Sequence, residues 1–306
     1  MRETKITILG AGAWGTILAK LAAANGHNVR LWSRRSSMEL EDALEGAEIV
    51  LSAVSVKGVR AVATEIQSLP ISPQAIFVTA TKGLEPATTL TPSQIWQAFF
   101  PTHPVVILCG PNLSKEIERG LPAATVVAST DMAAAEIVQA AFSSLRFRVY
   151  TNFDPVGVEL GGILKNVMAI SAGACDGLQL GTNAKAALLT RGLIEIVRIG
   201  NSWGAKTETF YGLSGLGDLL ATCNSPLSRN YQVGYLLAQG KTLAATLGSL
   251  EGTAEGVNTA KVLMQHAQQH NISIPITTQV HRLLAGEVTP RQALEELMLR
   301  DIKPEI

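Results

Sequence analysis

The sequence KITILGAGAWG, residues 5–15, decides how the first part of this chain folds. Its first five residues, Lys5–Leu9, are rich in β-branched and apolar side chains and predict a buried strand. The glycines that follow have G-x-G-x-x-G spacing: Gly10 permits a tight turn, Gly12 lets the backbone approach a pyrophosphate, and Gly15 lets a helix pack against the strand. A glycine-rich turn without a ligand is the alternative. The position between a strand and a helix N-terminus, whose N–H groups attract phosphate, favours a dinucleotide-binding turn.

Short apolar runs and helical stretches continue to alternate up to about residue 150. Apolar strands separated by helices are typical of a parallel sheet that is buried on both faces. We therefore predict an α/β fold that begins with a Rossmann-like, doubly wound and mainly parallel sheet. The further strands expected are Asn28–Trp32, Glu48–Ala53, Ala75–Ala80, Val105–Cys109, Thr125–Ala128 and Arg146–Tyr150, and the helices expected are Ala13–Asn25, Met38–Leu44, Lys57–Gln67 and Met132–Phe142.

The strand pattern ends near Thr151–Pro155, and helix signals replace it. Asp154-Pro155 and Thr289-Pro290 each place a capping side chain before a proline at the first helical position. Ser228 can cap a helix that runs to about Gln239. The sequence therefore predicts two domains, a dinucleotide-binding domain over residues 1–152 and an all-helical domain over residues 153–306.

Composition excludes several classes of protein. The 306 residues are 47% hydrophobic and 16% charged, and 25 basic residues balance 25 acidic ones, so a broad nucleic-acid-binding surface is not expected. Cys109, Cys175 and Cys223 form no C-x-x-C pair, which argues against disulfides and zinc and favours a reduced, cytoplasmic setting. We expect no metal site, no membrane-spanning stretch of about 20 apolar residues and no membrane insertion.

Two arginines follow the second expected strand. Domains that prefer NAD carry an acidic residue at this place, about 20 residues after the glycines. Here the chain has Arg34 and Arg35, whose guanidinium groups suit the 2′-phosphate of NADP. A solvated basic turn is the alternative. The sequence favours NADP(H) as cofactor, with NAD(H) also possible.

The helical half contains polar residues in apolar surroundings. Lys165 lies in GGILKNVMAI, residues 161–170, where two helix-weakening glycines suggest a close approach by another part of the chain. A desolvated lysine is suited to proton transfer, although a lysine whose amine reaches water explains the pattern equally well. Asp218 can open a helix with Thr222 on the same face, and its carboxylate can orient Lys165 or act only as an N-terminal acid.

A third cluster, Ser228-Arg229-Asn230, stands at the start of an expected helix. A hydroxyl, a guanidinium and an amide next to free helix N–H groups can hold a phosphate. An ordinary helix cap followed by an exposed arginine is the alternative.

Six motifs together resemble the NAD(P)-dependent glycerol-3-phosphate dehydrogenases of the bacterial type, over almost the whole chain. This resemblance implies reduction of dihydroxyacetone phosphate to sn-glycerol 3-phosphate, reversibly, in support of glycerophospholipid synthesis. It also implies a Rossmann domain joined to a helical domain, and a homodimer. The motifs are GAGAWG (10–15), TKGLE (81–85), KNVMAISAG with DGL (165–178), GTNAKAALLTRGLIE (181–195), GLSGLGDLLATC (212–223) and SRN (228–230).

The resemblance also assigns roles to single residues. Lys165 resembles the proton donor or acceptor at the substrate C2 oxygen, and Asn166 and Thr222 match residues close to the pocket. Lys82 and Asp218 resemble catalytic residues that also bind substrate. The other implied substrate contacts are Gly110, Ser228, Arg229 and Asn230. The implied cofactor contacts are Gly10, Gly12, Trp14, Gly15, Arg34, Arg35, Lys82, Ser114, Arg229 and Glu255.

The chain departs from the family pattern at three places. The segment after Arg35 is short, Val54-Ser55-Val56 stands where Val-Pro-Ser is usual, and Asn112-Leu113-Ser114 stands where Ser-Phe-Ala is usual. Two other functions are compatible with the same architecture: a dehydrogenase that acts on a hydroxyacid or sugar acid, and a non-catalytic NADP(H)-binding sensor. The phosphate-binding cluster disfavours the first, and an intact Lys165 and Asp218 disfavour the second.

Overall fold

The computed structural model describes residues 2–302 and 304. The chain forms two compact units. The first contains Met1–Ile163 and Gly204–Asp218, and the second contains Leu164–Trp203 and Leu219–Ile306. The segment 204–218 thus returns to the first unit after the chain has entered the second.

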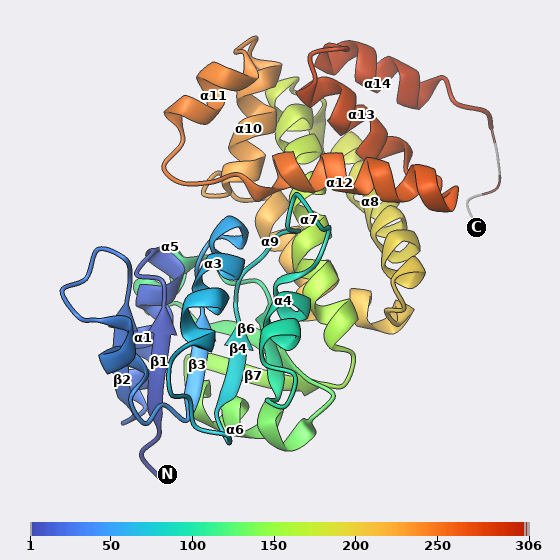
Figure 1. The fold of residues 1–306 in the computed structure, drawn as a ribbon. Helices are drawn as coiled ribbons and strands as arrows, with labels where there is room; N and C mark the ends of the chain where they lie inside the picture. The colour runs from blue at the N-terminus through green and yellow to red at the C-terminus, as the bar shows by residue number, and fades with distance from the viewer. Residues whose placement is uncertain (1, 303, 305–306) are drawn as a thin grey trace. The chain divides into compact units, whose positions relative to one another are not determined.

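A seven-stranded sheet forms the centre of the first unit (Figure 1). The strand order is β2-β1-β3-β4-β5-β6-β7, and every neighbouring pair is parallel except β5 with β6. This confirms the predicted Rossmann-like, mainly parallel sheet. The strands are β1 (Lys5–Leu9), β2 (Asn28–Trp32), β3 (Ile49–Ser52), β4 (Ile76–Thr79), β5 (Val105–Cys109), β6 (Ala123–Ala128) and β7 (Phe147–Asn152).

Helices cover both faces of this sheet and bury two apolar cores. One core includes Leu18 of α1 and Val138 of α6, and the other includes Val59 of α3 and Trp96 of α4. Continuous apolar strands are therefore stable in the centre of the sheet, because neither face meets water. The helices are α1 (Ala13–Ala24), α2 (Leu40–Leu44), α3 (Val56–Gln67), α4 (Pro92–Phe99), α5 (Ser114–Glu118) and α6 (Met132–Phe142).

The strand order places a topological switch point at β1. Its neighbours are β2 on one side and β3 on the other. The chain goes from β1 to β2 on one side and then crosses back past β1 to form β3 on the other side. Ligands of open α/β sheets bind outside the carboxyl ends of the strands at such a point. The glycine-rich turn follows β1 at this edge, and Lys82 and Gly110 follow the parallel strands β4 and β5 at the same edge.

The long helix α7 (Pro155–Gly177) begins after Asp154, whose carboxylate accepts a hydrogen bond from Gly157 N at 3.0 Å. Its length and mean hydropathy of 1.2 would suffice to cross a membrane, which was not expected from the sequence. However, 94% of its apolar window is buried inside the protein, as in the core helix of a soluble protein.

The second unit is helical, and no strand follows Asn152 in the described part of the chain. The predicted caps are present: Thr289 and Gln292 form a capping box, and Ser228 accepts a hydrogen bond from Tyr231 N. The remaining helices are α8 (Gly181–Ser202), α9 (Asp218–Cys223), α10 (Arg229–Ala238), α11 (Leu243–Ser249), α12 (Glu255–His270), α13 (Pro275–Leu284) and α14 (Pro290–Met298).

Candidate active site

The three glycines of the turn after β1 differ in whether the fold leaves space for a side chain at their position. Gly10 has φ 113°, and a Cβ there would lie 2.9 Å from Ala53. A Cβ on Gly15 would lie 1.9 Å from the Gly10 carbonyl oxygen. A Cβ on Gly12, the N-cap of α1, would meet nothing within 4 Å. Packing therefore explains Gly10 and Gly15, and the open space beside Gly12 fits the close approach of a dinucleotide pyrophosphate.

Arg34 and Arg35 lie in an exposed turn that follows β2 directly. The Ser36 hydroxyl donates to the Ser33 carbonyl oxygen at 2.6 Å and shapes this turn. Among the ion pairs found in residues 2–302, none involves either arginine. Both guanidinium groups are thus available to an anion at the edge where the glycine-rich turn lies.

Lys82 and Asp218 form an ion pair in the first unit, although 136 residues separate them in sequence. The Lys82 amine lies 2.6 Å from Asp218 Oδ2 and donates to the Gly110 carbonyl oxygen at 3.3 Å. Burial disfavours the charged amine, but the charge of Asp218 and its hydrogen bond outweigh this effect and raise the pKa of Lys82 to about 12. Lys82 is therefore a permanent cation near neutral pH.

The glycine pair of α7 explains how Asp218 reaches Lys82. A Cβ on Gly162 would lie 2.2 Å from the Cys109 sulfur, and a Cβ on Gly161 would lie 2.7 Å from the Ser214 carbonyl oxygen. The predicted close approach is therefore present, to β5 and to a π-helical turn over Leu213–Gly217. That turn leads directly into Asp218, so its contact with α7 positions the carboxylate.

Gly110 and Ser114 flank the loop after β5. A Cβ on Gly110 would lie 2.9 Å from Thr125 Cα, so β6 requires a glycine here. The Asn112 amide donates to the Thr125 hydroxyl at 2.9 Å, and Ser114 is the half-buried first residue of α5. One of the altered residues of this loop, Asn112, is therefore bound to β6 next to Gly110.

Lys165 belongs to the second unit and is 5% exposed. Its amine donates to the Thr222 hydroxyl of α9 at 2.5 Å. This burial excludes the alternative in which the amine extends into water. Asp218 belongs to the first unit, so the orientation of Lys165 by this carboxylate stays a prediction.

The start of α10 brings further predicted residues together in the second unit. The Asn230 side-chain oxygen accepts a hydrogen bond from Gly256 N at 2.9 Å, and a Cβ on Gly256 would lie 2.7 Å from the Asn166 carbonyl oxygen. Arg229 is exposed and lies beside Gly252. Glu255, the half-buried first residue of α12, accepts a hydrogen bond from Thr253 at 3.0 Å.

Two partners of the site were not predicted from the sequence. Glu85 of the TKGLE motif accepts two hydrogen bonds from Arg60 of α3, at 2.7 and 2.6 Å, which hold the loop that carries Lys82. The Arg60 guanidinium lowers the pKa of Glu85. Gly256 contacts both Asn166 and Asn230. The sequence gives no signal for either contact, because each one joins distant parts of the chain.

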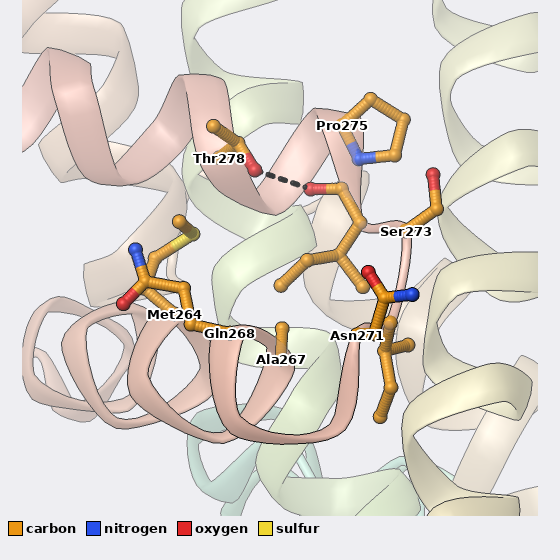
Figure 2. Close-up of a pocket in the computed structure, with 9 residues that line it drawn as sticks. Met264, Ala267, Gln268, Asn271, Ser273, Pro275 and Thr278 are labelled. Atoms are coloured by element: carbon orange, nitrogen blue, oxygen red, sulfur yellow. Dashed lines mark hydrogen bonds between the residues drawn. The ribbon is translucent and has the colours of Figure 1, made fainter.

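Other polar clusters add no metal site. Within residues 2–302 and 304, no group of three or more His, Cys, Asp or Glu side chains is placed to hold a metal ion. The three cysteines are buried and unbridged. A hollow of about 340 Å³ between α12 and α13 is lined by Met264, Asn271 and neighbouring residues, none of them a predicted site residue (Figure 2).

Comparisons with known proteins identify the family of this chain. The family model described as NAD-dependent glycerol-3-phosphate dehydrogenase C-terminus matches residues 154–295, and the corresponding N-terminus model matches residues 5–39 and 35–135. A relative from Nostoc sp. strain PCC 7120, named glycerol-3-phosphate dehydrogenase (NAD(P)+), is 75% identical over 100% of this chain and 99% of its own length.

A second sequence relative and a solved structure are also similar to this chain. A Synechocystis protein of the same name is 58% identical over 98% of this chain and 95% of its own length. The crystal structure of glycerol-3-phosphate dehydrogenase from Coxiella burnetii is 35% identical, with a TM-score of 0.92, and covers 97% of this chain and 99% of that one. This chain therefore belongs to the NAD-dependent glycerol-3-phosphate dehydrogenase family.

Proposed function

We propose that this chain is an NAD(P)-dependent glycerol-3-phosphate dehydrogenase, which reduces dihydroxyacetone phosphate to sn-glycerol 3-phosphate and catalyses the reverse reaction. The observation that carries the proposal is the Lys82–Asp218 ion pair beside Gly110, in a chain that belongs to this family. A cation held at the carboxyl edge of a Rossmann sheet is suited to a substrate whose carbonyl oxygen becomes negative.

The two lysines have different roles in this mechanism. When bound, the nicotinamide cofactor supplies the hydride to C2 of the substrate. Lys165 then gives its proton to the C2 oxygen, and the Thr222 hydroxyl, which accepts from the Lys165 amine at 2.5 Å, holds that amine in place. Lys82, with a pKa of about 12, keeps its proton and stabilises the negative oxygen by its charge.

The substrate phosphate binds at the start of α10 in this proposal. Ser228 caps the helix, Arg229 supplies a guanidinium, and Asn230 ties the helix to Gly256 at the start of α12. A guanidinium beside helix N–H groups suits a phosphate dianion. A bound phosphate would fix the carbonyl carbon for hydride transfer, which is the advantage of proximity.

We further propose a preference for NADP(H) over NAD(H), supported by the two exposed arginines after β2 and the absence of an acidic residue at the end of that strand. Replacement of Arg34 and Arg35 by alanine should lower kcat/KM for NADPH about tenfold or more, because two phosphate contacts are lost, and change it little for NADH. Equal losses with both cofactors would contradict the preference.

We propose that residues 1–152 bind the dinucleotide, that residues 153–306 bind the substrate, and that the protein is a cytoplasmic homodimer. We propose that it takes no nucleic-acid partner, does not insert into a membrane and supplies glycerophospholipid synthesis. The zero net charge supports the absence of a nucleic-acid partner, and the burial of α7 supports the absence of membrane insertion.

The test is the loss of NADPH absorbance after addition of dihydroxyacetone phosphate. Wild-type protein should turn over, and Lys165→Met should lose at least about 100-fold in kcat, because a general acid contributes about that much. Cofactor affinity, measured by NADPH fluorescence, should stay within about twofold. Near-normal turnover by Lys165→Met would contradict the role of Lys165. Turnover of unphosphorylated hydroxyacids alone would favour a different dehydrogenase, and no turnover would favour a sensor.

A further inference from the structure

We infer that Tyr231 is a positioning residue: through its hydrogen bond to Asp176 it sets where Arg229 and Asn230 lie along α7, the helix that carries Lys165. This inference rests on the proposed function, because it concerns the binding of the substrate phosphate. All of these residues belong to the second unit.

Asp176 is the centre of a polar cluster at the end of α7. The Tyr231 hydroxyl donates to Asp176 Oδ2 at 2.7 Å, and the Lys185 amine of α8 donates to the same oxygen at 2.6 Å. The Lys185 amine also lies 5.5 Å from the centre of the Tyr231 ring. Burial and the Asp176 carboxylate raise the pKa of Tyr231, so its hydroxyl stays a donor at all working pH values.

Glycines make the contact between α7 and α10 unusually close. A Cβ on Gly173 would lie 1.9 Å from the Tyr231 carbonyl oxygen, and a Cβ on Gly234 would lie 1.8 Å from the Ile170 carbonyl oxygen. The two backbones therefore touch. Such a contact has no interlocking side chains at these points, so contacts elsewhere along the two helices must set their axial register. A directional hydrogen bond to a charged group can fix it.

The register matters because α10 begins at the proposed phosphate site. Tyr231 follows Arg229 by two residues, about 3 Å along the helix axis. A small slide of α10 would therefore move Arg229, and would also displace the Asn230 side chain that accepts from Gly256 N. Misplacement of a substrate-binding group by about 1 Å can cost on the order of 100-fold in rate.

The experiment compares Tyr231→Phe with Tyr235→Phe in the full-length protein. Each variant removes one hydroxyl and keeps the ring. Tyr235 stacks on Tyr231 one turn later and is 40% exposed, so it is the matched control. Steady-state kinetics are measured with dihydroxyacetone phosphate and with unphosphorylated dihydroxyacetone, together with the thermal midpoint of unfolding and the Kd of NADPH.

We expect Tyr231→Phe to raise KM for dihydroxyacetone phosphate about tenfold, with kcat reduced less and with kcat/KM for dihydroxyacetone within about twofold. Tyr235→Phe should match the wild type in every measured quantity. Asp176→Asn, which keeps an acceptor for the hydroxyl but removes the charge, should raise KM by about threefold.

Two outcomes would overturn the inference alone. In one, the wild type is active, and Tyr231→Phe lowers the thermal midpoint but has the same KM as Tyr235→Phe. This result would mean that the Tyr231–Asp176 contact only stabilises the fold. In the other, Tyr231→Phe loses activity equally with both substrates. If the wild type does not reduce dihydroxyacetone phosphate, the proposed function fails, and the inference fails with it.

Discussion

Gly12 is the one glycine of the nucleotide turn that the protein's own packing does not require. Its backbone angles, φ −77° and ψ 176°, are open to any residue, and a Cβ there would meet no atom within 4 Å. Gly12→Ala should therefore leave the free energy of unfolding within about 0.5 kcal/mol of the wild type and weaken NADPH binding about tenfold or more, because the Cβ occupies the space that the pyrophosphate needs.

Urea unfolding and NADPH titration test this pair of effects together. Gly10→Ala is the contrasting variant: its φ of 113° and its 2.9 Å approach to Ala53 predict destabilisation of about 1–3 kcal/mol even without cofactor. A Gly12→Ala protein that binds NADPH as tightly as the wild type would show that the cofactor lies elsewhere.

Glu85 gives a pH-dependent prediction. Hydrogen bonds from Arg60 lower the pKa of this buried carboxyl below its unfolded value. The Glu85–Arg60 pair therefore adds to the free energy of unfolding above the unfolded pKa, and this contribution is lost as the pH falls through the folded pKa. Because Arg60 is partly exposed, Glu85→Gln should cost only about 1–2 kcal/mol at pH 7.

The difference between wild type and Glu85→Gln should shrink as the pH falls below the unfolded pKa of about 4.3, and it should vanish once the pH is below the lowered pKa of the folded state. Urea melts at pH 7 and pH 3.5 measure it. Glu118→Gln is the control, since the Lys20–Glu118 pair is exposed on both sides and should contribute little at either pH. A constant difference at both pH values would contradict the role of the charge.

At the level of residues, the sequence identified the site only where the pattern was local. Lys165 was conspicuous as a lysine among apolar neighbours, and its burial agrees with that. Lys82 was found only through the family resemblance, because its partner Asp218 is 136 residues away. Tyr231 was not singled out, since its bond to Asp176 spans 55 residues and leaves no periodic signal.

At the level of elements, strands and helices with strong patterns were predicted closely. The bounds of β1, β2, β5 and α6 agree with those expected from their apolar runs. Helix α4 was not predicted, although Thr91 and Gln94 form a capping box at its start. The five-residue α5 is too short for helical periodicity to appear. The antiparallel direction of β6 depends on tertiary pairing and has no local signal.

Gly162 tests how tightly α7 must approach β5. Its added Cβ would lie 2.2 Å from the Cys109 sulfur and 3.5 Å from the Lys82 side chain, so Gly162→Ala should destabilise the protein by about 1–3 kcal/mol and lower kcat. Gly248→Ala in α11, where a Cβ meets nothing within 4 Å, should stabilise it by up to about 1 kcal/mol.

Thermal and urea unfolding measure both variants, and a second substitution separates crowding from helix propensity. Cys109→Ala removes the atom with which the new Cβ collides, so the double variant Gly162→Ala/Cys109→Ala should recover part of the stability that Gly162→Ala alone loses. Costs that simply add would show that the clash with the sulfur is not the cause.

For the whole molecule, connectivity links the two units. The chain passes between them after Ile163, after Trp203 and after Asp218. The passage after Ile163 lies within the continuous helix α7, and the passage after Asp218 lies at the start of α9. Unfolding of the first unit alone would have to interrupt α7 in its middle, where the helix is buried and hydrogen-bonded. The units should therefore unfold in a single cooperative transition.

Cofactor binding provides the sharpest test of this cooperativity. Trp203→Phe leaves Trp14, Trp32 and Trp96, all in the first unit, as the fluorescent reporters, whereas far-UV circular dichroism reports mainly on the helices of both units. In this variant the two urea midpoints should coincide. NADPH at about 100 times its Kd should then raise both midpoints together, by the equivalent of about 2.7 kcal/mol, because it binds only the native state. In the contrary outcome, NADPH shifts the fluorescence midpoint while part of the dichroism change keeps its midpoint. The second unit would then unfold on its own, and the continuous α7 would not couple the cofactor site to the helices that carry Lys165 and Arg229.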